Sequence, residues 1–225
     1  LVGWEIELIK RAASELGAEV EFVPMAFGEI LPAVIAGEVN LGVGSIFSTP
    51  QRQLYVDFVN YGQGGVSWAT LTDRVETPFD PCGWRVASEV DTTNVNVSLP
   101  AASIDCRAAG KEPITIVPVK NLPLAVNLLQ REEIDAFIGD SPTVTYIIQE
   151  SGGRIAQTGV TQEVQSYGIA VNKDDRELSE SFVDALTSWA ATGDYDRLMG
   201  KWGVLDSEVS VFTINQLNPN DAESQ

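Results

Sequence analysis

The segment Phe47-Ser48-Thr49-Pro50-Gln51-Arg52 combines a helix-capping residue, a proline and, one turn further on, an arginine. Thr49 is a preferred N-cap and Pro50 suits the first helical position, so the segment predicts a short helix with free backbone N–H groups at its start. A guanidinium can hold a carboxylate through two parallel hydrogen bonds. Arg52 is therefore a candidate for binding an anionic group of a ligand. A surface ion pair with a nearby acid is the alternative.

Acidic residues dominate the charge of the chain. The 225 residues include 32 Asp and Glu against 14 Lys and Arg, which gives a formal net charge of -18. Binding to nucleic acid or to anionic lipid depends on Lys and Arg, so both partners are excluded. Most of the acids are expected on a solvated surface. Their clusters lack the glycine and spacing of a calcium loop, and we expect no metal or cofactor.

Histidine is absent from the sequence, and cysteine occurs twice, at Cys82 and Cys106. Without histidine there is no Ser-His-Asp triad, no Cys-His nucleophile and no histidine metal ligand. The two cysteines are too few for a zinc site and too far apart for a thioredoxin-like motif. A disulfide and two unrelated buried thiols remain open. The favoured disulfide implies an oxidising, extracytoplasmic compartment.

Strands and helices are expected to alternate along the chain. Helices are predicted at residues 4–16, 29–36, 122–131, 142–150, 175–191 and 195–202, and strands at 19–23, 39–43, 85–87, 114–117 and 134–138. This order favours an α/β fold with a parallel sheet and helices on its faces. No apolar run is long enough to span a membrane, and the polar tail beyond Asp206 is expected to be mobile.

Two stretches repeat one plan. Residues 30–45 and 124–141 each read as a helix, a tight turn and a strand that ends in small polar residues. In open α/β sheets, ligands bind outside the carboxyl ends of the strands. The repeat therefore predicts two similar lobes with a ligand site in a cleft between them.

Short motifs follow one another along the whole chain: Gly3-Trp4-Glu5-Ile6-Glu7-Leu8, Ile30-Leu31-Pro32-Ala33 with Gly37, Thr49-Pro50-Gln51-Arg52, Val56-Asp57-Phe58, residues 134–142, residues 167–171, Gly193-Asp194-Tyr195 and Lys201-Trp202-Gly203. This series resembles the solute-binding proteins of polar amino-acid ABC transporters. In that family a first strand and its ligand loop precede the Gly-aromatic-acid motif. We expect the given sequence to lack both a signal peptide and this amino-terminal strand.

The resemblance implies a two-lobed type II periplasmic-binding-protein fold, with two open, mostly parallel sheets flanked by helices. Two crossing hinge strands, near residues 68–72 and 167–171, would join the lobes. Lobe 1 would comprise residues 1–71 and 169–225, and lobe 2 residues 72–168. Ligand binding would then favour closure of the hinge, a motion known for periplasmic binding proteins.

The resemblance also assigns roles to particular residues. Arg52 would grip the α-carboxylate of an amino acid, and Asp140 would receive its α-ammonium group. A zwitterion leaving water needs a fixed, opposite partner for each charge, which this pair would supply. Further ligand contacts are implied for Phe27, as an aromatic wall, and for Ser45, Thr92 and Thr93.

Three positions bear on specificity. Phe47 stands where the family commonly has a Thr or Ser hydroxyl, and Asp91 stands where it usually has glycine. Glu89 occupies a strand end that can face the ligand side chain. Glu89, Asp91 and Asp140 would together make an acidic cleft that favours a cationic ligand such as arginine or lysine. Membership of Glu89 and Asp91 in the general acidic surface is the alternative.

The resulting expectation is a non-enzymatic, monomeric, extracytoplasmic or periplasmic protein, free or lipid-anchored. It would deliver an amino acid, or a similar small amine-bearing ligand, to an ABC permease. One alternative is an enzyme on the same fold, a prephenate- or arogenate-type dehydratase with Glu89 as general acid. Another is the ligand-sensing domain of a receptor or channel.

Overall fold

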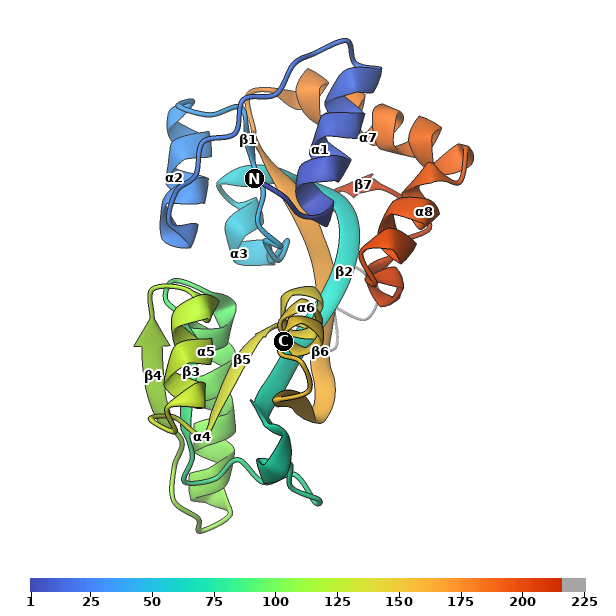
Figure 1. Cartoon of the computed structure of the whole chain (residues 1–225). Helices are drawn as coiled ribbons and strands as arrows, with labels where there is room; N and C mark the ends of the chain where they lie inside the picture. The colour runs from blue at the N-terminus through green and yellow to red at the C-terminus, as the bar shows by residue number, and fades with distance from the viewer. Residues whose placement is uncertain (216–225) are drawn as a thin grey trace. The chain divides into compact units, whose positions relative to one another are not determined.

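The computed structural model describes residues 1–215 of the chain, which form two compact α/β units (Figure 1). Unit 1 is built from residues 1–64 and from residue 164 onward, and unit 2 from residues 65–163. Within the described part, no helix has the length and apolar character needed to cross a membrane.

Three helices of unit 1 share one apolar core: α1 (Trp4–Glu15), α7 (Arg176–Ala191) and α8 (Asp194–Lys201). One face of α1 is apolar and buried, and Leu8 on it is fully covered in the same core as Phe182 of α7. The helix stops at Gly17, which has a φ of 68°. Glycine takes this left-handed conformation without the steric cost of a Cβ atom. The sequence predictions for these helices are confirmed within two residues.

The helices α2 (Phe27–Ala36) and α3 (Pro50–Gln53) also form as predicted. Between them, β1 (Leu41–Gly42) is shorter than the expected strand at 39–43. It pairs antiparallel with β6 (Ile155–Asn172), where Leu41 lies opposite Val171.

The predicted strand at residues 19–23 is wrong. The alternation itself is present, because Val20 and Phe22 pack against the core while Glu19 and Glu21 are exposed. Within residues 1–215, however, no hydrogen bond involves the backbone of this segment. An apolar groove of about 680 Å³ is lined by residues 18–25 and 38–43. A strand needs a hydrogen-bonded neighbour, and in the described part of the chain none pairs with this segment.

In unit 2 the sheet runs in the order β4–β3–β5, and β5 pairs antiparallel on its other side with residues 66–69 of the long strand β2 (Val56–Leu71). Its strands are β3 (Arg85–Glu89), β4 (Thr115–Val119) and β5 (Ala136–Asp140), and its helices are α4 (Leu99–Ala108), α5 (Leu122–Gln130) and α6 (Ser141–Glu150). The three strands are parallel, as predicted. The sequence analysis did not foresee α4, nor the single π-helical turn at Asn94–Ser98 that leads into it.

Two long strands, β2 (Val56–Leu71) and β6, run from one unit into the other. The chain changes unit after Gly64 and again after Glu163. The two expected crossings, near residues 68–72 and 167–171, fall on these same two strands. The lobe boundaries derived from the resemblance stay a prediction.

The first residues beyond Asp206 belong to the fold, although we expected a mobile tail to begin there. Residues just beyond Asp206 are packed on unit 1, where the side chain of Phe212 is buried. The strand β7 (Thr213–Ile214) pairs antiparallel with β2. Apolar residues among the polar ones hold this stretch in place. The rest of the tail, residues 216–225, lies outside the described residues.

A disulfide joins Cys82 to Cys106, with the two Cα atoms 5.5 Å apart. It ties the segment before β3 to α4. Next to it, the ring of Phe79 packs edge-on against Trp68 and Trp84. The favoured disulfide prediction is therefore confirmed, and unrelated buried thiols are ruled out.

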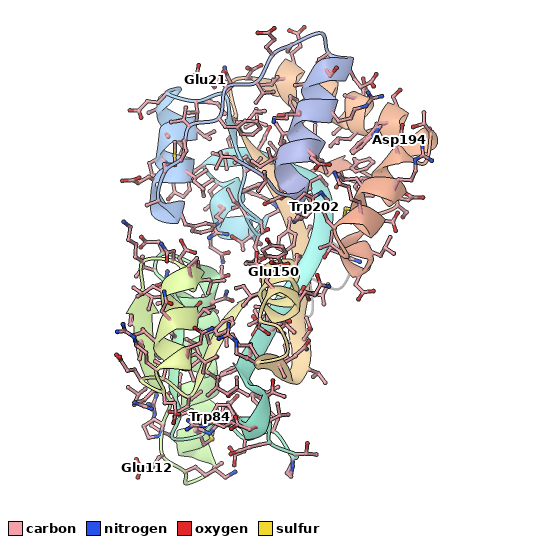
Figure 2. All side chains as sticks on the ribbon, viewed as in Figure 1. Glu21, Trp84, Glu112, Glu150, Asp194 and Trp202 are labelled. Carbon is pink, nitrogen blue, oxygen red and sulfur yellow. A yellow bond between two sulfur atoms is a disulfide. The ribbon has the colours of Figure 1, made fainter. Side chains whose placement is uncertain are left out.

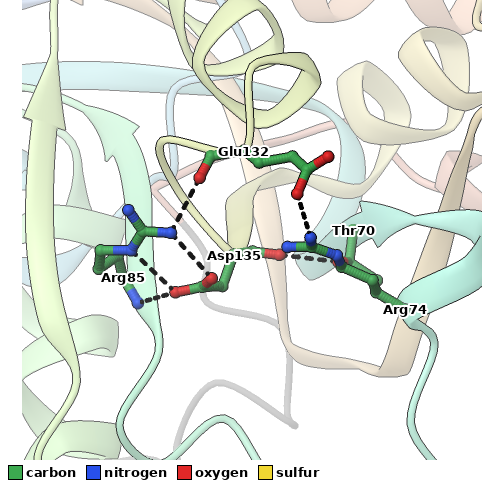
Figure 3. A network of polar contacts seen from close by, with 5 residues as sticks. All are labelled: Thr70, Arg74, Arg85, Glu132 and Asp135. Carbon is green, nitrogen blue, oxygen red and sulfur yellow. Dashed lines mark hydrogen bonds and ion pairs between the residues drawn. The ribbon is translucent and has the colours of Figure 1, made fainter.

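A polar network closes the amino-terminal ends of β3 and β5 (Figure 3). Asp135 accepts hydrogen bonds from the backbone N–H of Arg85 at 2.7 Å and from its Nε and Nη2 at 3.2 and 3.1 Å. Thr70 Oγ1 donates to the Asp135 carbonyl at 2.7 Å, and Arg74 pairs with Glu132 alongside. Burial raises the pKa of Asp135, but the hydrogen bonds from Arg85 outweigh it and hold the pKa below its usual value. The network occupies the amino-terminal edge of the sheet. The residues at the opposite edge, where these strands end, do not take part in it.

Candidate functional site

The short helix α3 carries Arg52, and its start is fixed as the sequence predicts. Thr49 Oγ1 accepts a hydrogen bond from the backbone N–H of Arg52 at 3.3 Å, and Pro50 occupies the first helical position. The side chain of Arg52 turns back to the preceding loop, where Nη1 donates to the carbonyl oxygen of Phe47 at 3.0 Å. One nitrogen of the guanidinium is thus anchored to the protein's own backbone.

The second neighbour of the Arg52 guanidinium is the aromatic ring of Phe27. The guanidinium carbon lies 5.6 Å from the ring centre of Phe27, a cation–π distance. Burial lowers the pKa of Arg52. Among residues 1–215, no Asp or Glu forms an ion pair with Arg52, so the surface-pair alternative finds no support there. A partly desolvated cation without a carboxylate is suited to bind an anionic group.

Phe47 has its ring in the core of unit 1. The side chain is 4% exposed, and its ring stacks on Tyr167 with the ring centres 5.1 Å apart. Phe47 contacts Arg52 through its backbone carbonyl oxygen. The side chain therefore has a structural role in the core, and a ligand contact from Phe47 remains a prediction.

Ser45 lies on the loop between β1 and α3. Its backbone φ is 47°, a left-handed value that is uncommon for residues other than glycine. Its N–H donates to Glu5 Oε1 at 2.7 Å, so this N–H is already engaged within the protein. The hydroxyl of Ser45 stays a predicted ligand contact.

Two acids meet at the carboxyl edge of the sheet in unit 2. Glu89 ends β3 and Asp140 ends β5, and these strands are parallel neighbours. Ser88 Oγ donates to the Ile138 carbonyl at 2.9 Å and holds the two strand ends together. Burial raises the pKa of Glu89, and the negative charge of Asp140 raises it further. The structure therefore brings these two predicted residues together as an electrostatically coupled pair.

Asp140 has a structural task as well. Its Oδ2 accepts hydrogen bonds from the Thr143 backbone N–H at 3.2 Å and from Thr143 Oγ1 at 2.6 Å, so Asp140 caps α6. Capping fixes the carboxylate at the helix start, where the helix dipole favours a negative charge.

The loop after β3 contains the other three predicted residues. Asp91 is exposed and has a φ of 63°, a value that suits the glycine usual in the resembling family. The Thr92 hydroxyl donates to the Glu89 carbonyl at 2.6 Å and accepts from the Val95 N–H at 3.4 Å, so it stabilises the turn. Thr93 directly precedes the π-helical turn. Ligand contacts from this loop remain a prediction.

The remaining acids include many that are plainly solvated. Glu21, Glu112 and Glu150 are exposed (Figure 2), in contrast to the half-buried Glu89 and Asp140. The sequence analysis gave no role to Glu5, whose carboxylate reaches the Ser45 loop. Its position in the first turn of a helix, within the motif Gly3-Trp4-Glu5, was the available signal.

Two α/β units joined by two long strands, with polar residues at strand ends in both, define a protein of the type II periplasmic-binding-protein fold. Residues 1–204 match the family model of the bacterial extracellular solute-binding proteins, family 3. The chain belongs to this family, and it is a solute-binding protein.

Individual relatives support the assignment. The chain is 32% identical over 219 residues to the arginine-binding protein ArgT of Corynebacterium glutamicum, covering 96% of this chain and 71% of that one. The structure of an ancestral arginine-binding protein bound to arginine is 27% identical and matches with a TM-score of 0.76, covering 89% of this chain and 88% of the other. The structure of an ancestral amino-acid-binding protein, AncCDT-1, described as a precursor of cyclohexadienyl dehydratase, is 25% identical with a TM-score of 0.77, covering 89% and 85%.

Proposed function

We propose that this protein captures an amino acid with a cationic side chain and delivers it to an ABC permease. The observation that carries the proposal is the half-buried guanidinium of Arg52, which faces Phe27 and has no carboxylate partner among residues 1–215. The α-carboxylate of an amino acid supplies the missing negative charge. Two of its oxygens fit the planar fork of the guanidinium.

The carboxylates of unit 2 are the proposed partners of the positive groups of the ligand. In the proposal, Asp140 receives the α-ammonium group and Glu89 the cationic end of the side chain. Burial and mutual repulsion make the pair costly to keep charged, as the raised pKa of Glu89 indicates. A ligand with two positive groups relieves that cost, whereas a neutral side chain leaves Glu89 unpaired.

The relatives support this choice of ligand. One is named an arginine-binding protein, and one solved neighbour was bound to arginine. The Cys82–Cys106 disulfide fits an oxidising compartment outside the cytoplasm. We propose that the protein works there as a monomer, free or lipid-anchored, with the permease as its partner.

Ligand binding can be tested directly. A thermal-shift screen of amino acids, polyamines and betaines, followed by calorimetry, measures affinity because a ligand of the folded state raises the melting temperature. Arginine or lysine should bind at least tenfold more tightly than glutamine, and glutamate should not bind. Equal affinity for neutral and cationic amino acids would contradict the cationic ligand, and no shift with any amino acid would contradict the proposed function.

An enzyme on this fold is the second candidate, and one observation favours it. The raised pKa of Glu89 is what a general acid requires. We propose binding rather than catalysis, because burial and the nearby charge of Asp140 raise the pKa of Glu89 in a binding site as well. Turnover of prephenate or arogenate by the purified protein would establish the enzyme instead.

The alternative that this chain is the sensing domain of a receptor or channel is tested by sequencing the full reading frame. A membrane helix following this chain would support sensing, and a secretory or lipoprotein signal ahead of it would support transport.

A further inference from the structure

The carboxylate of Glu5 joins three separate segments of unit 1. Its Oε1 accepts a hydrogen bond from the Ser45 N–H at 2.7 Å and another from the hydroxyl of Tyr61. Glu5 lies in the first turn of α1, Ser45 on the loop after β1, and Tyr61 on β2. One side chain therefore fixes the Ser45 peptide against a helix and a strand.

The backbone conformation of Ser45 requires stabilisation by its surroundings. A serine at a φ of 47° is in the left-handed region, which disfavours residues with a Cβ atom. A hydrogen bond from its N–H to a charged acceptor is stronger than one between neutral groups and can offset this strain. The loop continues from Ser45 through Ile46 to Phe47, whose carbonyl oxygen accepts a hydrogen bond from Arg52 at 3.0 Å.

Glu5, the acceptor in this contact, is surrounded by well-packed aromatic residues. Trp4, next to Glu5 in the helix, packs on the ring of Tyr61 with the ring centres 5.5 Å apart. Tyr61 is almost fully buried, with 1% exposure. An acid in the first turn also benefits from the helix dipole. Glu5 is thus a charged group on a rigid support, aimed at the strained residue of a loop.

We propose that Glu5 is a positioning residue for ligand recognition: it holds the Ser45 peptide in its left-handed conformation and so sets the path of the loop from Ser45 to Phe47, against which Arg52 is anchored. The inference rests on the proposed function, because it concerns the same carboxylate-binding residues. Glu5 acts through Ser45 and Phe47 and does not itself touch the ligand.

The test compares Glu5→Ala with Glu7→Ala. Both acids lie in the first turn of α1, but Glu7 bonds to Lys201 at 2.7 and 2.8 Å and has no contact with the loop. Calorimetry with arginine should give at least a tenfold loss of affinity for Glu5→Ala and less than a twofold loss for Glu7→Ala. Equal losses for the two variants would overturn the proposal.

A second comparison separates positioning from general stability. Glycine adopts a positive φ without strain, so Ser45→Gly should reduce the effect of Glu5→Ala to less than threefold in a double-mutant cycle. An undiminished effect in the glycine background would show that Glu5 does not act through the Ser45 backbone. If Glu5→Ala fails to fold, Tyr61→Phe removes only a hydroxyl and should lower affinity about threefold, while unchanged affinity would count against the proposal.

A readout without ligand distinguishes this inference from the proposed function. Exchange of the Ser45 amide hydrogen should accelerate at least tenfold in Glu5→Ala and stay unchanged in Glu7→Ala, whatever the ligand is. Faster exchange in a protein that binds no amino acid would refute the proposed function and leave the Glu5–Ser45 relationship standing. Unchanged exchange would refute the inference alone.

Discussion

Arg52 Nη1 donates a hydrogen bond to the carbonyl oxygen of Phe47 at 3.0 Å, so the guanidinium proposed to hold the ligand also fastens the loop in front of it. The Phe47 ring is in turn locked in the core against Tyr167. A binding group that is already fixed loses less side-chain entropy when the ligand arrives.

Arg52→Ala should abolish measurable binding of the amino acid. Removing one member of a desolvated charge pair costs about 2–5 kcal/mol, which is a loss of at least about 30-fold in affinity. Arg52→Lys keeps the charge but not the fork, and we expect about a tenfold loss. Calorimetry measures both. Arg11→Ala, which breaks an exposed pair with Glu15, is the matched control, and near-normal affinity in Arg52→Ala would show that the carboxylate binds elsewhere.

Asp140→Asn should separate ligand binding from helix capping. Asparagine is as good an N-cap as aspartate, so the melting temperature should change by only about 2 °C, while affinity for arginine falls about 10- to 100-fold. Thr143→Val provides the complementary change, because it removes the 2.6 Å donor to Asp140 and should lower stability by about 1 kcal/mol with affinity within threefold. Wild-type affinity in Asp140→Asn would place the ammonium group elsewhere.

Glu89 should give the binding of arginine a pH dependence. Its raised pKa means that it takes up a proton at a higher pH than an ordinary glutamate, so arginine affinity should weaken more than glutamine affinity between pH 7 and pH 5. Glu89→Gln should remove this difference and bring the two ligands within about threefold of each other. Identical pH profiles in the wild type and the variant would exclude Glu89 from recognition.

The same group has the opposite effect on the ligand-free protein. The folded state binds more protons than the unfolded chain between the ordinary pKa of glutamate and the raised pKa of Glu89. The ligand-free fold therefore gains stability relative to Glu89→Gln as the pH falls through that window.

Replacing both Cys82 and Cys106 by serine should lower the free energy of unfolding by about 3 kcal/mol, the value expected for cross-linking a loop of this length. Urea unfolding measures the change. A reducing agent should destabilise the wild type by a similar amount and leave the double variant unaffected. Two titratable thiols in unreduced native protein would contradict the bridge.

Asp135→Asn should lower the free energy of unfolding by about 1 kcal/mol at pH 7, because asparagine keeps only one acceptor oxygen and no charge, so the bidentate ion pair with Arg85 is lost (Figure 3). The pKa of Asp135 is lowered in the folded protein, so its contribution is complete above the ordinary pKa of aspartate and fades as the pH falls through the folded value. Urea unfolding at pH 7 and pH 3.5 should show the difference shrinking. Glu133→Gln, in a loose exposed pair with Arg131, should change little at either pH.

Local signals in the sequence predicted several elements correctly because each carries its own physical cause. Thr49 and Pro50 start α3, and Gly17 and Gly37 end the helices before them. The segment at 19–23 shows the limit of such signals. Its alternation describes which side chains face the core, but a strand also needs a partner, and the pattern of one segment says nothing about its neighbour.

The length of β2 was hidden by its glycines, which interrupt an apolar pattern and are typical of turns. A side chain at Gly64 would collide with the hydroxyl of Tyr167, so glycine there permits the close approach of two strands. The electrostatic coupling of Glu89 with Asp140 could not be predicted from the sequence either. It depends on β3 and β5 being neighbours in the sheet, although about 50 residues separate them in the chain.

The division of the chain has a consequence for its synthesis. Unit 2 is one uninterrupted stretch, residues 65–163, whereas unit 1 needs both the first 64 residues and those from 164 onward. A chain emerging from a secretion channel into an oxidising compartment can therefore complete unit 2, with its disulfide, while α1, α2 and α3 still lack the second half of β6, α7 and α8. Until those arrive, the apolar face of α1 stays exposed, and a chaperone that covers it would act on this half of the molecule alone.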